Sequence, residues 1–374
     1  MTDFCRAAPI PQRPPPKFSR PFRAVLRENF FADWTSAAIT FAVFAFLALA
    51  LPPLWRFFIE DAVWRAPDGA LCRAPGAGAC WAFIAAKGPF FLYGAYPPDQ
   101  RWRVDIAFGL AAALIFWLLA PGARKGRAAL GLFVVLPPVG FALLSGAPAL
   151  GLPRVETTLW GGAMVTLLVA LTGIVVALPG GALLALGRRS GLPALRFFCA
   201  AVIEFARGAP LIAVLFMANA MLPLFLPADW APDRLLRPLF GVALFASAYM
   251  AEVVRAGLNA VPPGQSEAAP ALGFGRIATL RFVVLPQAFA AVIPAIVNNF
   301  VALFKDTTLV AIVGIFDFLH TVDIARLDPR WAGPKIAATA YVFAGLFYLA
   351  FCLSMSAYAR GVERRLSASR PPRL

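Results

Sequence analysis

The sequence predicts an all-α polytopic membrane protein with about eight transmembrane helices. Three observations favour this fold class: 60% of the 374 residues are hydrophobic, only 14% are charged, and the mean hydropathy is +0.75. Soluble globular proteins contain roughly 45–50% apolar and about 25% charged residues. The apolar excess therefore argues against an ordinary soluble enzyme and excludes a disordered chain.

Eight apolar segments meet or approach the length of about 20 residues that a helix needs to cross the hydrocarbon core. They run over 36–55, 104–121, 129–146, 159–187, 197–222, 236–255, 287–304 and 336–359. The fourth and fifth segments are longer than needed, so we expect these helices to tilt or to extend beyond the membrane. The seventh segment is the shortest, and it contains Pro294, Asn298 and Asn299.

The basic residues predict the orientation of these spans. The net charge is +15, and an even number of spans places both termini on one side of the membrane. If that side is cytoplasmic, the inner loops 124–127 and 188–196 contain three cations each, whereas the outer loop 147–158 contains only Arg154. Cytoplasmic loops are enriched in Lys and Arg. We therefore expect both termini in the cytoplasm, and no nucleic-acid partner, because the positive charge is spread over separate loops.

The chain divides into an accessory N-terminal half and a C-terminal core. Residues 1–34 form a cytoplasmic tail rich in Pro and Arg, which we expect to be extended and to contact anionic membrane lipid. Residues 35–155 form an accessory transmembrane region with an outer, periplasmic insert at 56–103. Residues 156–365 form the core, and residues 366–374 form a second cytoplasmic tail.

Cysteine spacing gives two predictions. Cys72 and Cys80 lie in the outer insert with seven residues between them. In an oxidising periplasm a disulfide between them is expected; the alternative is two free thiols in a partly buried loop. The single histidine, His320, cannot complete a zinc site with the scattered cysteines, so no metal site is predicted.

The longest inner loop, residues 256–286, has the pattern of a small helical motif. Pro262 and Pro263 stop the preceding helix. Ser266 is a candidate cap for a new helix, and Glu267 in its first turn would complement the helix dipole. Gly273 can supply a left-handed C-terminal residue. We expect a second short helix at about 275–283.

The end of this loop predicts where the next span begins. The second short helix is expected to end before Leu285, and Pro286 is suited to the first helical position of the seventh span. The result is a cytoplasmic helix–turn–helix, apolar along Ala268, Ala271 and Leu272. Such a surface suits a groove on a partner protein.

The same loop resembles the EAA loop of ABC importer permeases. The resemblance rests on Glu267-Ala268-Ala269, Gly273, and Leu285-Pro286 after Val283. Four further runs resemble the polar amino-acid branch of that family more closely. They are Ala248–Gly257 with Ala260–Pro262 and Gly264-Gln265, Arg207–Leu211, Leu285–Ala288 and Phe304–Val310. Pro263 and Pro270 depart from the family pattern.

This resemblance covers about 156–365 and implies a C-terminal five-helix core of the type I ABC importer permeases. The extra spans and outer insert before it resemble the longer permease of general L-amino-acid and glutamate/glutamine/aspartate systems. The resemblance implies a bacterial inner-membrane protein that couples the closure of an ABC ATPase to alternating access through residues 266–286. It also implies a second permease subunit and a periplasmic amino-acid-binding protein.

The chain itself is not expected to be an enzyme. It contains no G-x-x-x-x-G-K-[ST] phosphate-binding loop, so ATP and magnesium would be bound by the partner ATPase and this chain would hold no cofactor. A membrane enzyme would need clustered His, Cys or carboxylates, which are sparse. The alternative function is an ion-coupled secondary amino-acid transporter, for which we would expect duplicated halves and ionisable groups at mid-membrane.

Polar residues in and after the seventh span are candidates for the substrate pathway. Asn298 and Asn299 lie mid-span, where interhelical hydrogen bonding is the alternative role. Lys305 and Asp306 could bind the carboxylate and ammonium groups of an amino acid, or form a salt bridge at the channel mouth. Thr307 and Thr308 would add hydroxyl groups.

Two acid–base pairs lie near the inner ends of the fifth and sixth spans. Glu204 and Arg207 are three residues apart, as are Glu252 and Arg255. This spacing allows each pair to meet on one helix face. The sequence leaves two roles open, local charge pairing and an inner gate.

Overall fold

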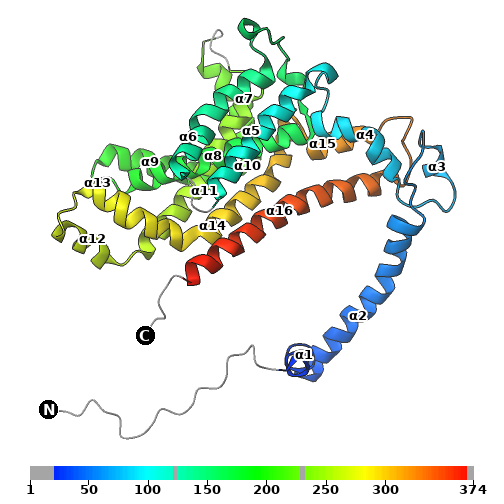
Figure 1. Ribbon diagram of the computed structural model, residues 1–374, viewed down its shortest axis with the longest axis horizontal. Helices are drawn as coiled ribbons and strands as arrows, with labels where there is room; N and C mark the ends of the chain where they lie inside the picture. The colour runs from blue at the N-terminus through cyan, green and yellow to red at the C-terminus, as the bar shows by residue number, and fades with distance from the viewer. Residues whose placement is uncertain (1–20, 121–123, 228–231, 369–374) are drawn as a thin grey trace. The chain divides into compact units, whose positions relative to one another are not determined.

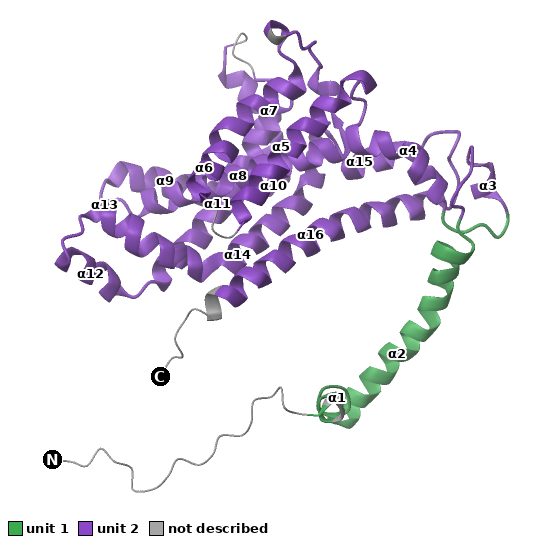
Figure 2. Cartoon of the chain, viewed as in Figure 1, with its two compact units in different colours: residues 1–62, 75–79 green, residues 63–74, 80–374 purple. Residues whose placement is uncertain are grey.

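The computed structural model describes residues 21–120, 124–227 and 232–368 (Figure 1). Much of the two predicted tails, at residues 1–20 and 369–374, lies outside the described residues. The chain folds as two compact units, which Figure 2 shows in different colours. Unit 1 consists of residues 1–62 and 75–79, and unit 2 consists of residues 63–74 and 80–374.

Unit 1 is built around one long apolar helix. Helix α1 (Phe22–Phe30) precedes α2 (Trp34–Trp55), which continues into a π-helical turn at Arg56–Glu60. No residue of α2 is buried, although its sequence is apolar on every side. A helix with that composition is expected to face lipid.

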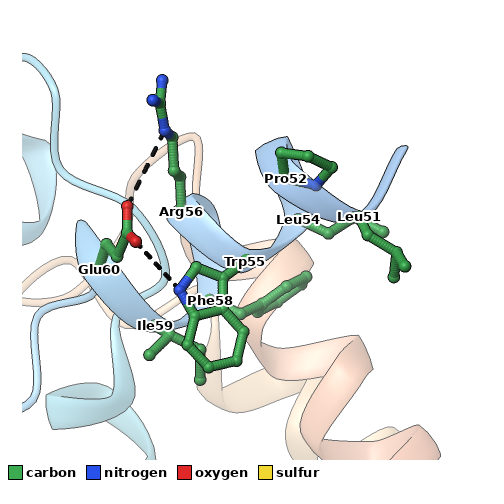
Figure 3. A pocket seen from close by; sticks show the side chains of 8 residues that line it. All are labelled: Leu51, Pro52, Leu54, Trp55, Arg56, Phe58, Ile59 and Glu60. Atoms are coloured by element: carbon green, nitrogen blue, oxygen red, sulfur yellow. Dashed lines mark hydrogen bonds and ion pairs between the residues drawn. The ribbon is translucent and has the colours of Figure 1, made fainter. Parts of the chain in front are cut away.

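The end of α2 has a polar cluster beside a shallow pocket. The pocket, about 730 Å³, is lined by eight residues of this unit between Leu51 and Glu60 (Figure 3). The Trp55 indole donates a hydrogen bond to Glu60 at 3.0 Å, and Arg56 lies 3.9 Å from the same carboxylate. Aromatic and charged residues of this kind are typical of the membrane–water interface.

Unit 2 contains the remaining elements. Its helices are α3 (Ala70–Arg73), α4 (Trp81–Tyr93), α5 (Arg101–Leu119), α6 (Lys125–Leu130), α7 (Leu136–Ser145), α8 (Gly162–Arg188), α9 (Pro193–Gly208), α10 (Leu211–Phe216), α11 (Leu236–Ala260), α12 (Pro263–Ala271), α13 (Arg276–Ala278), α14 (Leu285–Asp306), α15 (Phe318–Ala325) and α16 (Ile336–Ala368). Its π-helical turns are Gly131–Val135, Met217–Met221 and Thr279–Val284. Its 3₁₀ turns are Pro98–Gln100, Pro148–Leu150, Thr157–Leu159, Leu222–Phe225 and Thr307–Val313. The short strand β1 (Phe316–Asp317) bridges in parallel to Gly161 and Gly162.

The number of predicted spans is confirmed. Across the described residues seven helices are long and apolar enough to cross a membrane, and one bent helix pair makes an eighth candidate. The seven are 34–60, 98–119, 125–145, 162–188, 236–260, 276–313 and 336–365. The eighth candidate is 193–225. Each contains or overlaps one predicted segment.

The fifth span is not the single tilted helix that its sequence predicts. Helices α9 and α10 meet at an angle of 112°. The break is at Ala209, which has extended backbone angles (φ −95°, ψ 142°) and is followed by Pro210. Proline has no N–H to donate and disfavours helical angles in the residue before it. The apolar composition that continues through the break hides this bend in a hydropathy profile.

Helices α8 and α11 form the centre of unit 2, and α9, α10 and α14 pack around them. The close approach of α8 to α11 depends on Gly181. A Cβ at this position would lie 2.6 Å from the Met250 Cβ and 2.8 Å from the Ala251 nitrogen. Small residues allow helices in membranes to pack this closely.

The accessory spans pack against the same centre. Residues of α5, Leu132 and α7 form an apolar cluster with Val175 of α8. Spans two and three therefore share unit 2 with the predicted core, and the boundary between the two compact units does not fall at residue 155.

The part of the outer insert that belongs to unit 2 is attached by a disulfide and an aromatic cluster. The structure joins Cys72 and Cys80 in a disulfide. The Cys80 N–H donates to the Thr339 hydroxyl of α16 at 2.9 Å. Phe83 and Phe91 of α4 pack with Phe318 and Trp331 in one buried cluster. Helix α4 is thereby fixed to α15 and α16.

Candidate functional site

The loop after α11 folds as a helix–turn–helix motif, residues 263–284, which we call the loop motif. Helix α11 ends at Ala260, and Val261 is extended, as the two following prolines require. Helix α12 then begins at Pro263, with Pro262 as its N-cap. The motif lies at one end of α11 and α14 (Figure 1).

The cap assigned to Ser266 is wrong. Helix α12 starts four residues earlier, so Ser266 and Glu267 lie inside it and no acidic residue occupies its first turn. The reason is Pro263, whose fixed φ angle suits the first position of a helix. The Glu267 side chain is therefore exposed on the body of α12 and does not cap the helix.

Gly273 closes α12 in the manner expected from the sequence. Its φ angle is +83°, in the left-handed region. The Phe274 N–H donates to the Ala269 carbonyl at 3.1 Å, and the Gly273 N–H donates to the Pro270 carbonyl at 2.9 Å. These two bonds form a Schellman motif, which uses the carbonyls that a helix end leaves free.

The chain does not break before Pro286. Helix α13, the π-helical turn Thr279–Val284 and α14 follow one another without interruption, and Leu285 has helical backbone angles. Leu285 and Pro286 therefore lie in the first turn of α14, but the second short helix does not end before them. The π-helical turn accommodates an extra residue, so the helix continues into α14 although the sequence predicts that it ends before Leu285.

The loop motif presents apolar side chains to its surroundings. Leu272 and Ile277 are 79% and 82% exposed, and Phe282 is also exposed. Glu267 and Ala268 are exposed, whereas Ala269 is buried. Exposed apolar groups beside basic residues mark a surface for another protein.

A second feature is a charge network at one end of α8, α9 and α11. Arg188 lies 3.0 Å from Glu204 and 2.9 Å from Glu252. Glu252 also pairs with Arg255 at 2.7 Å and with Arg207 at 3.6 Å. We call these five residues the inner network.

The predicted pair of Glu252 and Arg255 is present, but Glu204 and Arg207 do not pair with each other in the described structure. Arg207 instead reaches Glu252, and its guanidinium lies 5.7 Å from the centre of the Tyr249 ring. Glu204 is joined to Arg188 of α8. The network therefore connects three helices and does not consist of two local pairs.

A third feature is a cavity of about 160 Å³ between α11 and α14. It is lined by Phe245, Ala246, Tyr249, Asn299, Ala302, Leu303 and Asp306. Its volume exceeds that of several water molecules but is below the roughly 300 Å³ of typical ligand pockets. Asn299 and Asp306 lie seven residues apart, so they share one face of α14.

The other candidate pathway residues are placed outside this cavity. Asn298 and Lys305 are exposed. The Thr307 hydroxyl donates to the Phe304 carbonyl at 2.7 Å, and the Thr308 hydroxyl donates to the Lys305 carbonyl at 3.0 Å. Both hydroxyls thus satisfy the end of α14, and Thr307 is buried.

Comparison with known proteins decides the family. Residues 177–368 match the family described as binding-protein-dependent transport system inner membrane component. The chain belongs to this family. It is 44% identical, over 97% of its length and 98% of the relative, to the inner membrane amino-acid ABC transporter permease protein YhdY of Escherichia coli.

A second relative agrees with this assignment. The chain is 37% identical to the glutamate/glutamine/aspartate/asparagine transport system permease protein BztC of Rhodobacter capsulatus, over 98% of both chains. It also resembles a chain in the crystal structure of an amino acid ABC transporter with histidines, at 28% identity. The TM-score there is 0.47, with 55% of this chain and 92% of that chain covered.

Family membership fixes the general role of the protein. It is a membrane-spanning permease subunit of an ABC importer, a transport component and not an enzyme. Permeases of ABC transporters work with an ATPase and a binding protein. The ion-coupled alternative receives no support from these similarities.

The structure also places in these features residues that the sequence did not indicate. Arg188 is the centre of the inner network, yet in the sequence it is one of three cations in a basic loop. Phe245 and Tyr249 line the cavity, and their rings lie 4.6 Å apart. The four-residue spacing of these aromatics was the available signal, because it places both on one face of α11.

Proposed function

We propose that the chain is the permease subunit of an ATP-driven amino-acid import complex in a bacterial inner membrane, with both termini cytoplasmic. The proposal is supported by the relatives named above, both described as permeases for amino acids. It is also supported by the distribution of cations between the loops that the spans define.

The observation that carries the proposal is the exposed loop motif, joined without a break to a long helix. From Arg276 to Val313 the chain forms one apolar helical segment. A displacement of the motif by a docked ATPase would therefore be transmitted along α14 and not absorbed in a hinge. The contact would involve the exposed faces of Glu267, Ala268 and Leu272, with buried Ala269 and left-handed Gly273 setting the shape of the turn.

The inner network would respond to the same movement. It joins the ends of α8, α9 and α11, and α11 leads directly into the loop motif. Coupling requires two states that the partner stabilises differently. We propose that the ion pairs of Arg188 and Arg207 with Glu252 hold the inner side of the permease in one of them.

The cavity between α11 and α14 would be part of the amino-acid pathway. Asp306 supplies a carboxylate for an ammonium group, Asn299 supplies an amide, and Tyr249 and Phe245 supply aromatic faces, which attract cations. Lys305, next to Asp306 and exposed, remains a candidate for the carboxylate of the substrate. Thr307 and Thr308 have weaker support, because their hydroxyls already bond to helix carbonyls.

The partners follow from this arrangement. An ABC ATPase would bind ATP and magnesium and dock on the loop motif from the cytoplasm. A periplasmic amino-acid-binding protein would deliver substrate from outside, and a second permease would complete the pathway. Helix α2, in which no residue is buried, would face membrane lipid.

Reconstitution in proteoliposomes tests the proposed function. The permease, its candidate ATPase, second permease and binding protein should hydrolyse ATP faster when an amino acid is added, and should accumulate that amino acid only with ATP. Omission of the ATPase is the control. Accumulation driven by a sodium or proton gradient without the ATPase would instead show an ion-coupled transporter.

A further inference from the structure

Helix α5 contains a buried arginine whose hydrogen-bonding capacity is mostly unused. The side chain of Arg103 is 0% exposed. Its Nη1 donates to the Pro153 carbonyl at 2.9 Å. Its Nε and Nη2 are buried and have no hydrogen-bond partner among the described residues.

The surroundings of Arg103 supply no negative charge. Within the described ranges no carboxylate forms an ion pair with this side chain. Its neighbour along the helix, Val104, belongs to an apolar cluster with Leu144, Val155 and Trp160. The guanidinium also lies 5.8 Å from the ring of Trp102, which is a weak contact for a buried charge.

The Tyr96 side chain interacts with Arg103, but a neutral hydroxyl does not balance the positive charge. The Tyr96 hydroxyl donates to the Leu144 carbonyl at 2.8 Å. Burial raises the pKa of Tyr96, and the positive charge of Arg103 opposes this shift. The Trp160 ring lies 6.4 Å from that of Tyr96, and its indole N–H is buried with no acceptor in the described part of the chain. This part of unit 2 therefore contains unused donors and an uncompensated cation.

A guanidinium keeps its charge in proteins, so it cannot become neutral to relieve burial. Buried charges are stable only when they are paired, and buried polar groups are almost always hydrogen-bonded. Arg103 lies where α5, the segment after α7 and the start of α8 meet. An anion at this point would complete the connection between the accessory spans and the core.

We propose that Arg103 binds a small monovalent inorganic anion of the size of chloride, with its Nε and Nη2 as donors. Complete burial of the side chain favours an ion enclosed by protein over a lipid phosphate, which would need an opening to the membrane surface. The site is structural, and it is independent of the proposed transport function.

Thermal unfolding of the purified full chain in detergent tests the site. Potassium chloride and potassium gluconate are compared at equal ionic strength. Chloride should raise the midpoint temperature of the wild type in a saturable manner, by roughly 3 °C or more. Arg103→Gln should lose this dependence. Arg154→Gln is the matched control, because Arg154 is exposed and lies next to Pro153 in the sequence, and it should keep the dependence.

A second measurement keeps the proposal testable if Arg103→Gln does not fold. Crystals of the wild-type protein in sodium bromide should show anomalous scattering beside the Arg103 guanidinium. A wild-type midpoint that is equal in chloride and gluconate, together with no bromide at Arg103, would overturn the proposal. Stabilisation by phosphatidylglycerol but not by chloride would also overturn it, in favour of a lipid phosphate.

Discussion

Arg188, the last residue of α8, lies between two carboxylates on different helices. Its guanidinium is 3.0 Å from Glu204 of α9 and 2.9 Å from Glu252 of α11. One side chain thus joins three helices. Arg188→Gln should lower the free energy of unfolding by about 1–3 kcal/mol, because Glu252 is largely buried and loses one of its charged partners.

The neighbouring Arg189 provides the control for this prediction. Its side chain is exposed and bonds to Asn259. Arg189→Gln should change stability by less than about 1 kcal/mol. Denaturant unfolding of both variants in detergent measures the difference, and equal losses would mean that the network contributes no special stability.

The contact between α8 and α11 predicts a strong effect of one methyl group. In Gly181→Ala the new Cβ would meet the Met250 Cβ at 2.6 Å and the Ala251 backbone nitrogen at 2.8 Å. Backbone cannot move away as a side chain can, so we expect a loss of about 1–3 kcal/mol. Gly140→Ala, where no atom lies within 4 Å of the added methyl, should be neutral or slightly stabilising. Thermal unfolding checks both variants, and similar midpoints would contradict the close packing.

The cavity predicts a separation between transport and stability. Asp306→Asn removes the carboxylate of the cavity and should reduce amino-acid uptake by about tenfold or more, since hydrogen bonds to charged groups contribute roughly 1.5–3 kcal/mol. The melting temperature should be nearly unchanged. Asn298→Leu, outside the cavity, is the control and should retain uptake within about twofold. Full uptake by Asp306→Asn would remove this residue from the pathway.

A buried carboxylate predicts how stability depends on pH. Asp317 caps α15, where it accepts the Leu319 N–H at 3.0 Å and the His320 N–H at 3.1 Å. Burial raises the pKa of Asp317 from 3.8 to about 6, although its hydrogen bonds oppose the shift. The folded protein therefore holds this proton to a higher pH than the unfolded chain does.

The sign of the effect follows from that difference. The free energy of unfolding should fall as pH rises from about 4 to about 6, by up to about 3 kcal/mol for this group. Asp317→Asn should lack this component, because an amide does not titrate. Its single oxygen can accept only one of the two N–H groups, so the variant should be less stable by an amount that does not depend on pH. Melting temperatures of both proteins between pH 4.5 and 7.5 measure the difference, and parallel profiles would contradict the account.

The sequence was sufficient for the spans and for the turn at Gly273. Hydropathy gives the positions of long apolar helices. The turn at Gly273 depends on local backbone preferences, which tertiary contacts did not change. Even so, Pro263 and not Ser266 determined the start of α12. The bend at Ala209 was missed because apolar residues continue through it, although Gly208 and Pro210 were a visible signal.

The ion pairs between different helices could not be predicted from the sequence. The three-residue spacing of Glu204 and Arg207 allowed a local pair, but Arg188 from another helix competes for the same carboxylate. The choice depends on how α8, α9 and α11 pack. The same holds for Asn299, which lines the cavity between α11 and α14, whereas Asn298 does not. The two residues differ only in the side of α14 on which they lie. A single sequence does not contain the rotation of one helix against another.

The central claim is that the loop motif transmits the work of an ATPase, and Gly273 tests it most directly. Gly273→Asp places a side chain on a residue with φ +83°, whereas Gly275→Asp adds the same charge two residues away at φ −69°. Neither position has an atom within 4 Å of the added Cβ. The two variants therefore differ in backbone conformation and in capping, because Gly275 is the N-cap of α13, where Asp is favourable.

The measurement is co-purification of the ATPase with each variant from membranes, with the amount of inserted permease as reference. The account predicts that Gly273→Asp reduces ATPase recovery and amino-acid uptake by about tenfold or more, while Gly275→Asp has the smaller effect. Wild-type recovery of the ATPase with Gly273→Asp would contradict it.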